Sequence, residues 1–452
     1  MARNWLIQNA IMVNEGSRFE GDLRIRAGRI ELIGAGLSAR ADEAVIDAEG
    51  RWLLPGMIDD QVHFREPGLT HKGDIQSESR AGVAGGITSF MEMPNTRPPA
   101  TSIESLEAKF SIAAHTAVAN YSFYLGATND NLAEIRRLDP TRSCGLKVFM
   151  GASTGNMLVD NPQTLDGIFR DATSIVITHC EDTPTIDANQ VLFKARYGDS
   201  VGPQHHHLIR SREACIKSTR LAMELARKHN TRLHVLHITT AEEAQLFEPG
   251  PIEGKRITAE TCVHFLHFDA RDLQPDGARH LGNFIKCNPA IKESSDREAL
   301  IAALREGRLD VLATDHAPHT LAEKLLPYAE APSGLPLVQH ALQCALERVF
   351  DGQLTLECIV DRCAHASARL FGVRERGFLR EGYWADLVLV DPHKPHTIRR
   401  EDVLSRCGWS PFEGETFRSS IAATFVNGVR VWHQGSFDQI ETGSRLSFNA
   451  RR

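Results

Sequence analysis

The order of hydrophobic and polar positions divides the chain into a long repetitive middle and two shorter ends. Between residues 56 and 374, apolar runs typical of buried strands alternate with amphipathic stretches typical of helices. This alternation predicts an α/β fold, a parallel (β/α)8 TIM-like barrel that spans residues 56–374. The eight strands are expected at 57–63, 87–93, 120–126, 145–150, 175–179, 233–237, 256–261 and 310–314, and the helices at 103–114, 131–138, 211–229, 241–247, 336–350, 356–361 and 364–371.

The two ends of the chain show a different pattern. Residues 1–55 and 375–440 contain short segments typical of strands, and the dipeptides Ala27-Gly28 and Asn427-Gly428 favour tight hairpin turns between them. We therefore expect both ends to meet in one small β-sandwich domain. Within the barrel, residues 180–210 and 262–296 are expected to be long irregular loops, and the final residues to be poorly ordered.

Composition narrows the class of protein. The 452 residues carry a formal net charge of -7, so no basic excess points to nucleic acid or to an anionic membrane as the partner. The sequence has no uninterrupted apolar run of about 18 residues, the length expected of a membrane span. Nine cysteines occur without a Cys-x-x-Cys pair, which predicts reduced thiols in a cytoplasm.

Polar side chains stand at the ends of five of the predicted strands, where a barrel of this kind places its chemistry. In the first strand Gln61 and His63 are two residues apart, so both side chains point to the same face. Imidazoles and a carboxylate that converge on one barrel mouth suit Zn²⁺ or a similar divalent ion. The full set is Gln61, His63, Lys147 in the fourth strand, His179 in the fifth, His237 in the sixth and Asp315 after the eighth.

Lys147 lies within the apolar strand segment 145–150. A buried ammonium group is costly unless it is paired or neutralised. Its amine can react with CO₂ to form a carbamate, which converts a cation into a carboxylate able to bridge two metal ions. The alternative is an ion pair between Lys147 and a barrel carboxylate.

Several longer motifs resemble the dihydroorotase, allantoinase and hydantoinase group of the amidohydrolase superfamily. The likeness covers nearly the whole chain. The motifs are Pro55-Gly56-Met57-Ile58-Asp59 followed by Val62-His63-Phe64-Arg65-Glu66-Pro67-Gly68, then Met93-Pro94-Asn95-Thr96, then Asn288-Pro289, and finally Ala313-Thr314-Asp315-His316-Ala317-Pro318-His319. Within the group, Arg65 and Asn95 favour the dihydroorotase family.

The resemblance implies a function and a role for each site residue. The function is the reversible hydrolysis of L-dihydroorotate to N-carbamoyl-L-aspartate in de novo pyrimidine (UMP) biosynthesis. Asp315 would carry the proton from the attacking hydroxide to the leaving nitrogen, and a guanidinium fork suits the substrate carboxylate. The implied ligands of one or two Zn²⁺ ions are His63, Lys147 as N6-carboxylysine, His179, His237 and Asp315, and the implied substrate-binding residues are Arg65, Asn95, His319 and Asn288. A homodimer is the family expectation.

Gln61 departs from the family pattern, which usually has His-x-His at this point. An amide oxygen is a weaker ligand for zinc than an imidazole, so the metal position beside Gln61 is expected to be the weaker one. Because a metal ligand is replaced, a non-catalytic partner of aspartate transcarbamoylase stays open as an alternative. The other alternative is an allantoinase- or hydantoinase-type cyclic amidase, whose substrates lack the carboxylate that Arg65 would bind.

Other conspicuous residues are expected to have supporting roles. His205-His206-His207 is predicted to belong to a lid or to anchor a loop. Cys180 follows His179 but has no evident base to make it a nucleophile. His316 is expected to support the metal ligands or to pack, and Asp59 to support the barrel floor.

Overall fold

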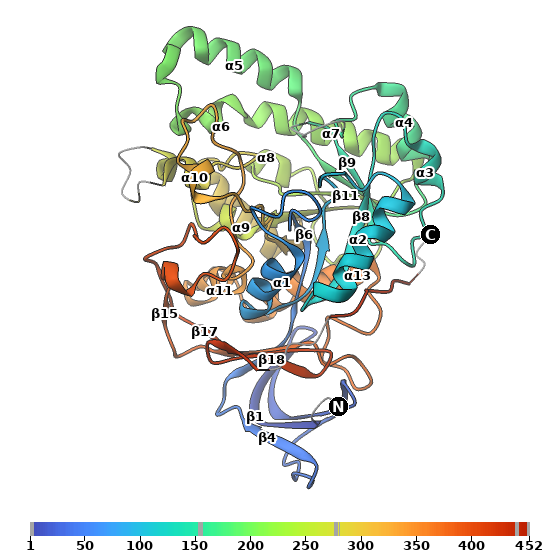
Figure 1. Ribbon diagram of the computed structural model, residues 1–452, viewed down its shortest axis with the longest axis vertical. Coiled ribbons are helices and arrows are strands. Elements are labelled where there is room, and N and C mark those ends of the chain that lie inside the picture. The colour runs from blue at the N-terminus through green and yellow to red at the C-terminus, as the bar shows by residue number, and fades with distance from the viewer. Residues whose placement is uncertain (1–3, 152–156, 275–278, 280, 439–442, 450–452) are drawn as a thin grey trace.

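The computed structural model describes residues 4–151, 157–274, 279, 281–438 and 443–449. It contains an eight-stranded parallel sheet surrounded by helices and a separate, mostly antiparallel sheet of nine strands. In Figure 1 the nine-stranded sheet lies below the helical body. The predicted α/β class and the TIM-like barrel are therefore confirmed.

The parallel sheet contains all eight predicted strands. Each strand pairs with the next in chain order. A parallel bridge between Val62 and His316, with the His63 N–H donating to the His316 carbonyl at 2.7 Å, brings the last strand against the first. The strands are β6 (Met57–Val62), β7 (Ile87–Glu92), β8 (Asn120–Gly126), β9 (Gly145–Phe149), β10 (Val176–His179), β11 (Leu233–Val235), β12 (Ile257–Cys262) and β13 (Val311–Ala313).

Most predicted helices are present, but some bounds were wrong. The stretch 180–210 is not irregular, because α5 and α6 occupy much of it. Only Ile186 is buried in α5, so this helix has no apolar stripe that the sequence could reveal. The helices are α1 (Ile75–Ala84), α2 (Ile103–Thr116), α3 (Leu132–Arg136), α4 (Pro162–Asp171), α5 (Thr183–Tyr197), α6 (His206–Ile209), α7 (Arg212–His229), α8 (Ala241–Ala244), α9 (Ser294–Glu306), α10 (Leu321–Lys324), α11 (Ala341–Phe350), α12 (Leu356–Val360) and α13 (Ala366–Phe371).

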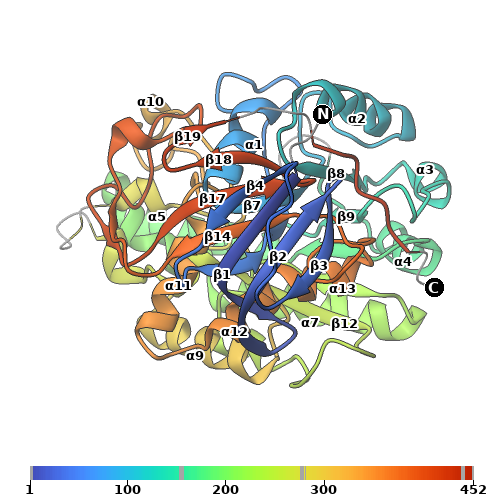
Figure 2. The same cartoon turned by 90° about the horizontal axis from the view of Figure 1, so that it is seen from below.

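Both chain ends contribute to the second sheet, which Figure 2 shows from below. The β5 and β14 strands join the two ends, with Leu53 opposite Leu389. The predicted β-sandwich is therefore, in its hydrogen bonding, one continuous sheet. Its strands are β1 (Asn4–Asn14), β2 (Ser17–Arg26), β3 (Arg29–Gly34), β4 (Glu43–Asp47), β5 (Trp52–Pro55), β14 (Leu387–Asp391), β17 (Ser420–Val426), β18 (Val429–His433) and β19 (Ser436–Phe437), and a separate pair is formed by β15 (His396–Thr397) and β16 (Thr416–Phe417).

The hairpin turns and the chain end can be compared with their predictions. Asn427 and Gly428 have φ values of 52° and 77°, as a turn with two left-handed residues requires, so this predicted turn is confirmed. Residues 443–449 are ordered against the barrel, where Leu446 and Phe448 are buried, which corrects the expectation of disorder for that stretch. Residues 450–452 lie outside the described part. No helix among the described residues has the length and apolar character needed to cross a membrane.

Candidate metal centre

The predicted ligands lie in two groups at the ends of the barrel strands. The first group surrounds Asp315, which follows β13. Its Oδ1 lies 3.3 Å from His63 Nε2 and accepts a hydrogen bond from Gln61 Nε2 at 3.0 Å. Burial raises the pKa of Asp315, but the hydrogen bond from His63 and the nearby imidazoles outweigh burial and lower the pKa to about 2. Asp315 is therefore a carboxylate at neutral pH.

Gln61 contributes a hydrogen-bond donor to this group. Its amide nitrogen faces Asp315, whereas its oxygen lies 3.9 Å from the Cys262 sulfur. An amide nitrogen has no lone pair to offer a metal ion, so in this orientation Gln61 holds Asp315 in place. Where the family usually has a histidine, this chain therefore has a side chain that donates a hydrogen bond to Asp315.

The second group consists of His179 at the end of β10 and His237 just after β11. His179 Nδ1 and His237 Nε2 lie 2.9 Å apart. His179 Nε2 faces Glu181 at 2.9 Å, and Glu181 also accepts from Arg210 Nε at 3.0 Å. Because His179 Nε2–H donates a hydrogen bond to the Glu181 carboxylate, His179 Nδ1 carries the lone pair of the neutral ring. His237 Nε2 therefore donates to His179 Nδ1, and a metal ion bound by both rings would replace this hydrogen bond.

Lys147 on β9 lies near both groups and is 1% exposed. Burial lowers its pKa to about 7, although the charges of Asp315 and Glu260 act in the opposite direction. Within the described part of the chain, no carboxylate oxygen lies within 4.0 Å of its amine. The alternative of an ion pair with a barrel carboxylate therefore finds no support, and the neutral amine is the form that can add CO₂.

Three of these site residues have backbone conformations that ordinary side chains rarely adopt. The φ angles are 72° at Arg65, 43° at His237 and 53° at Asp315. Left-handed φ values cost free energy at residues other than glycine, and they occur where the surrounding structure imposes them. All three residues lie two or three positions after the ends of β6, β11 and β13, where the chain turns as it leaves the barrel.

Arg65 provides the cation on one side of the mouth, where burial and nearby cations hold the pKa of His319 well below its ordinary value and Lys72 pairs with Glu323 at 2.8 Å. Arg65 Nη2 lies 3.1 Å from His319 Nε2, and Arg65 Nε donates to the Pro318 carbonyl at 3.1 Å. Lys72 Nζ lies 3.0 Å from His319 Nδ1. Burial lowers the pKa of Arg65 to about 10, and in the described residues no carboxylate oxygen lies within 4.0 Å of its guanidinium.

The two predicted substrate-binding asparagines have different surroundings. Asn95 Oδ1 lies 2.8 Å from His63 Nδ1, so it orients a predicted metal ligand in this structure. Asn288 Oδ1 lies 3.2 Å from His206 Nε2. Asn288 also lines a cavity of about 660 Å³ together with Arg210, Lys286, Tyr328 and Ser333, whose carbonyl lies 3.0 Å from His319 Nε2.

The residues expected to have supporting roles occupy separate positions. Each histidine of 205–207 has its own partners: His205 stacks on Tyr197, His206 faces the Tyr328 hydroxyl at 2.8 Å, and His207 pairs with Glu293 at 3.2 Å. They therefore anchor a loop and do not share one metal. Elsewhere, His316 Nε2 lies 3.0 Å from Glu78, Asp59 accepts from the Thr314 hydroxyl at 2.6 Å, and burial raises the pKa of Cys180 to about 11, which makes it a poor nucleophile.

Sequence reasoning missed several residues that hold the site. Glu181 and Arg210 orient His179, and they are 29 positions apart in the chain. The Trp409 indole N–H donates to the His319 carbonyl at 2.7 Å from a segment 90 residues away. Glu181 could have been noticed because it follows His179 by two residues, but nothing in the sequence places Trp409 near the mouth.

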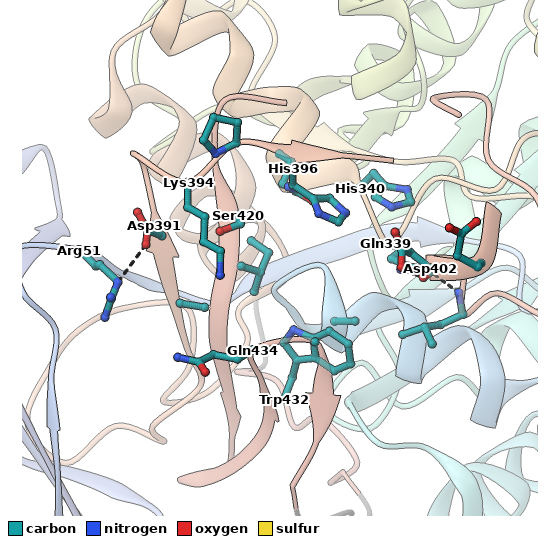
Figure 3. A pocket seen from close by; sticks show the side chains of 18 residues that line it. Arg51, Gln339, His340, Asp391, Lys394, His396, Asp402, Ser420, Trp432 and Gln434 are labelled. Carbon is teal, nitrogen blue, oxygen red and sulfur yellow. Dashed lines mark hydrogen bonds and ion pairs between the residues drawn. The ribbon is translucent and has the colours of Figure 1, made fainter. Parts of the chain in front are cut away.

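A further hollow lies away from the barrel mouth, against the nine-stranded sheet. It has a volume of about 430 Å³ and is lined by side chains from both parts of the molecule, among them His340, Trp432 and Lys394 (Figure 3). Arg51 at its rim pairs with Asp391 at 3.2 Å. None of the predicted site residues lines it, so the chemistry of this protein is assigned to the barrel mouth.

The residues at the mouth fit a divalent metal centre. His179 and His237 present two converged imidazole nitrogens, Asp315 is ionised, and Lys147 is buried without an ion pair within the described residues. Imidazole and carboxylate are the ligands of catalytic zinc. His63 belongs to the same mouth through its contact with Asp315.

Comparison with known proteins agrees with this geometry. The model of the amidohydrolase family matches residues 52–431. A dihydroorotase from Halobacterium salinarum is 34% identical over 431 residues, which cover 94% of this chain and 96% of that protein. An allantoinase from Bacillus velezensis is 30% identical, covering 97% of this chain and 96% of that protein.

Solved structures show the same fold. The L-hydantoinase (dihydropyrimidinase) from Arthrobacter aurescens superposes with a TM-score of 0.92 and is 25% identical, with coverage of 99% of this chain and 100% of that chain. The converged ligands and the matching family model lead to one conclusion. The chain belongs to the amidohydrolase family and is a metal-dependent cyclic amidohydrolase.

Proposed function

We propose that this protein is a dihydroorotase, which reversibly hydrolyses L-dihydroorotate to N-carbamoyl-L-aspartate in de novo pyrimidine biosynthesis. The observation that supports this choice among cyclic amidases is the uncompensated guanidinium of Arg65. It is 8% exposed, yet no described carboxylate pairs with it. A buried cation without an anion is costly, so the site favours a substrate that brings its own carboxylate.

The local acids that could have paired with Arg65 are engaged elsewhere. Glu66 accepts from the Ile75 N–H at 3.0 Å, and Asp74 accepts from the Ser77 N–H at 2.6 Å and pairs with Arg406. These bonds argue against a purely structural ion pair for Arg65. His319 and Lys72 add two further nitrogen groups on the same side of the mouth.

The chain's own residues would divide the reaction between them. Arg65 and His319, with Asn95, would hold the substrate carboxylate, and the cavity beside Asn288 would receive the ring. Asp315 is ionised and lies at the mouth, so it can accept a proton and return it to the leaving nitrogen. His63, His179, His237, Asp315 and carboxylated Lys147 would hold one or two Zn²⁺ ions, and Gln61 would hold Asp315 in place. Zinc held there would supply a Lewis acid and lower the pKa of water.

A substrate panel tests the proposal. Purified zinc-loaded protein is expected to turn over L-dihydroorotate faster than allantoin or hydantoin. Arg65→Gln should lower kcat/KM for L-dihydroorotate by about 10- to 100-fold, since a hydrogen bond to a charged group contributes about 1.5–3 kcal/mol. The zinc content of the variant should not change. Turnover of allantoin or hydantoin without turnover of L-dihydroorotate would refute the proposal.

A second cyclic amidase activity deserves the same panel, because allantoinases of Bacillus velezensis and Streptomyces avermitilis are 30% and 31% identical to this chain. Their similarity leaves the carboxylate clamp as the deciding feature. If Arg65→Gln left the preferred substrate unchanged, the allantoinase alternative would gain. A protein with bound zinc and no activity on any member of the panel would instead support the non-catalytic partner.

We also propose a cellular location and an oligomeric state for this protein. All nine cysteines are free, and eight of them are buried, which is consistent with the reducing cytoplasm that we propose as the location. A homodimer is the proposed assembly, and binding of aspartate transcarbamoylase is a proposal that co-purification would test.

A further inference from the structure

We propose that Asp60, His234 and Glu260 form a second, interior site for a divalent cation, separate from the metal centre at the barrel mouth. The three side chains come from β6, β11 and β12 and are all fully buried. One ligand atom from each lies within 4.8 Å of the other two. This site does not depend on the substrate proposed above.

The tautomer of His234 follows from its neighbours. The Thr258 hydroxyl donates to the Leu233 carbonyl at 3.2 Å, so its oxygen is left to accept from His234 Nδ1 at 2.8 Å. His234 Nδ1 therefore carries the proton of the neutral ring. The lone pair of His234 Nε2 then faces the carboxylates.

That lone pair lies opposite two oxygens. His234 Nε2 is 3.2 Å from Glu260 Oε2 and 3.6 Å from Asp60 Oδ2. Three such atoms this close need either a proton or a metal ion between them, and burial, which raises the pKa of Glu260 to about 8, makes a carboxyl proton the competitor of the metal ion. Burial lowers the pKa of His234, which disfavours an imidazolium as the source of that proton.

The distances suit a metal ion. Ligands placed about 2.1 Å from a tetrahedral ion are about 3.4 Å from one another. The two separations from His234 Nε2 are close to this value. Two carboxylates and one imidazole are ligands for a first-row divalent cation such as Mn²⁺ or Zn²⁺.

Asp60 supplies an independent indication. Neither of its carboxylate oxygens has a hydrogen-bond partner among the described residues, although the side chain is 0% exposed. Buried carboxylates are normally hydrogen-bonded or bound to a cation. Glu260 is held differently, because its Oε1 accepts from the His237 N–H at 3.3 Å and only Oε2 faces the cluster.

Anomalous diffraction from the Mn²⁺-loaded protein tests the site directly. We expect a peak bounded by Asp60, His234 and Glu260, distinct from any peak at His179 and His237. Asp60→Asn should lose this peak and one equivalent of metal per chain, measured by plasma mass spectrometry. Glu243→Gln is the matched control, since Glu243 is also buried but is bonded to Thr219 and Thr240, and it should keep both.

The wild-type map decides the matter even if Asp60→Asn fails to fold. Density at the mouth without a peak at the interior cluster would overturn the inference, and a proton shared by Asp60 and Glu260 would then be the neutralising charge. His179→Asn should empty the mouth but retain the interior peak. An interior peak in protein that does not hydrolyse L-dihydroorotate would refute only the proposed function.

Discussion

The two sides of the metal centre differ in how far they satisfy their own polar atoms. On the side of His179 and His237, two imidazole nitrogens face each other, and Glu181 takes the outer proton of His179. On the side of Gln61 and His63, the groups bond to Asp315 and Asn95 instead. A metal ion on either side replaces existing contacts: the His179–His237 hydrogen bond on the first side, and the contacts of Asp315 with Gln61 and His63 on the second. This difference shows that Gln61, in place of the family's histidine, changes the site in two ways. It removes an imidazole, and its amide binds the neighbouring ligand Asp315.

The prediction with the largest expected effect is that the position formed by His179 and His237 binds metal more tightly than the position beside Gln61 and His63. His237→Asn removes one of its two imidazoles. The transition state should then lose several kcal/mol of stabilisation by the metal, so kcat should fall by about 10³-fold or more. Zinc content and L-dihydroorotate turnover measure the result. Cys180→Ala is the control, because its sulfur lies 3.3 Å from the Thr178 hydroxyl and no site role depends on it. Full zinc occupancy and activity in His237→Asn would contradict the assignment.

A smaller effect should come from Lys147, which stands between the two sides. Its pKa of about 7 is lowered by burial from the ordinary value near 10.5. CO₂ adds only to the neutral amine, and a drop from about pH 8 to about pH 6 lowers the neutral fraction by roughly tenfold. Carbamate formation in metal-free protein should therefore fall as the pH falls, with a midpoint near 7.

Carbon-13 NMR with labelled bicarbonate measures this signal. Lys147→Ala should lack it at every pH. A midpoint near 10, or a carbamate signal that survives in Lys147→Ala, would show that this lysine is not the acceptor.

The smallest expected effect sharpens the comparison on its weaker side. Gln61→His restores an imidazole and removes the amide that donates to Asp315. Metal affinity at the His63 side should rise on the order of tenfold, the equivalent of about 1.4 kcal/mol. Isothermal titration with Zn²⁺ resolves the two positions. Equal affinities for the two positions in both wild type and variant would mean that Gln61 does not weaken the site.

Much of the fold could be predicted because its signals are local. Apolar runs mark the eight strands, and Asn427-Gly428 marks a turn, since both depend on neighbouring residues. Helix α5 could not be found in the same way, because only Ile186 among its residues is buried. The start of a helix also differed from its prediction where the chain forms a turn first: α11 begins at Ala341 and not at residue 336.

The candidate site divides along the same line. The spacing of Gln61 and His63 and the polar ends of the strands are visible in the sequence, because parallel strands of a barrel end at one mouth. The sequence could also have drawn attention to Asp60 and Glu260, which interrupt apolar strands as Lys147 does. Their meeting with His234 could not be foreseen, because β6 is not a sheet neighbour of β11 and β12 and meets them only across the closed barrel.

By itself, the sequence determined the barrel, its family and the types of ligand available at the mouth. Only the tertiary structure decided what those ligands do: that Gln61 turns its nitrogen to Asp315, that Arg65 is buried without a described carboxylate, and that Asp60 lies near His234. The physical reason is the distance along the chain between the residues that interact. Strand patterns and motifs arise from neighbours along the chain, whereas lone-pair direction, burial and charge balance arise from residues that meet only when the barrel closes.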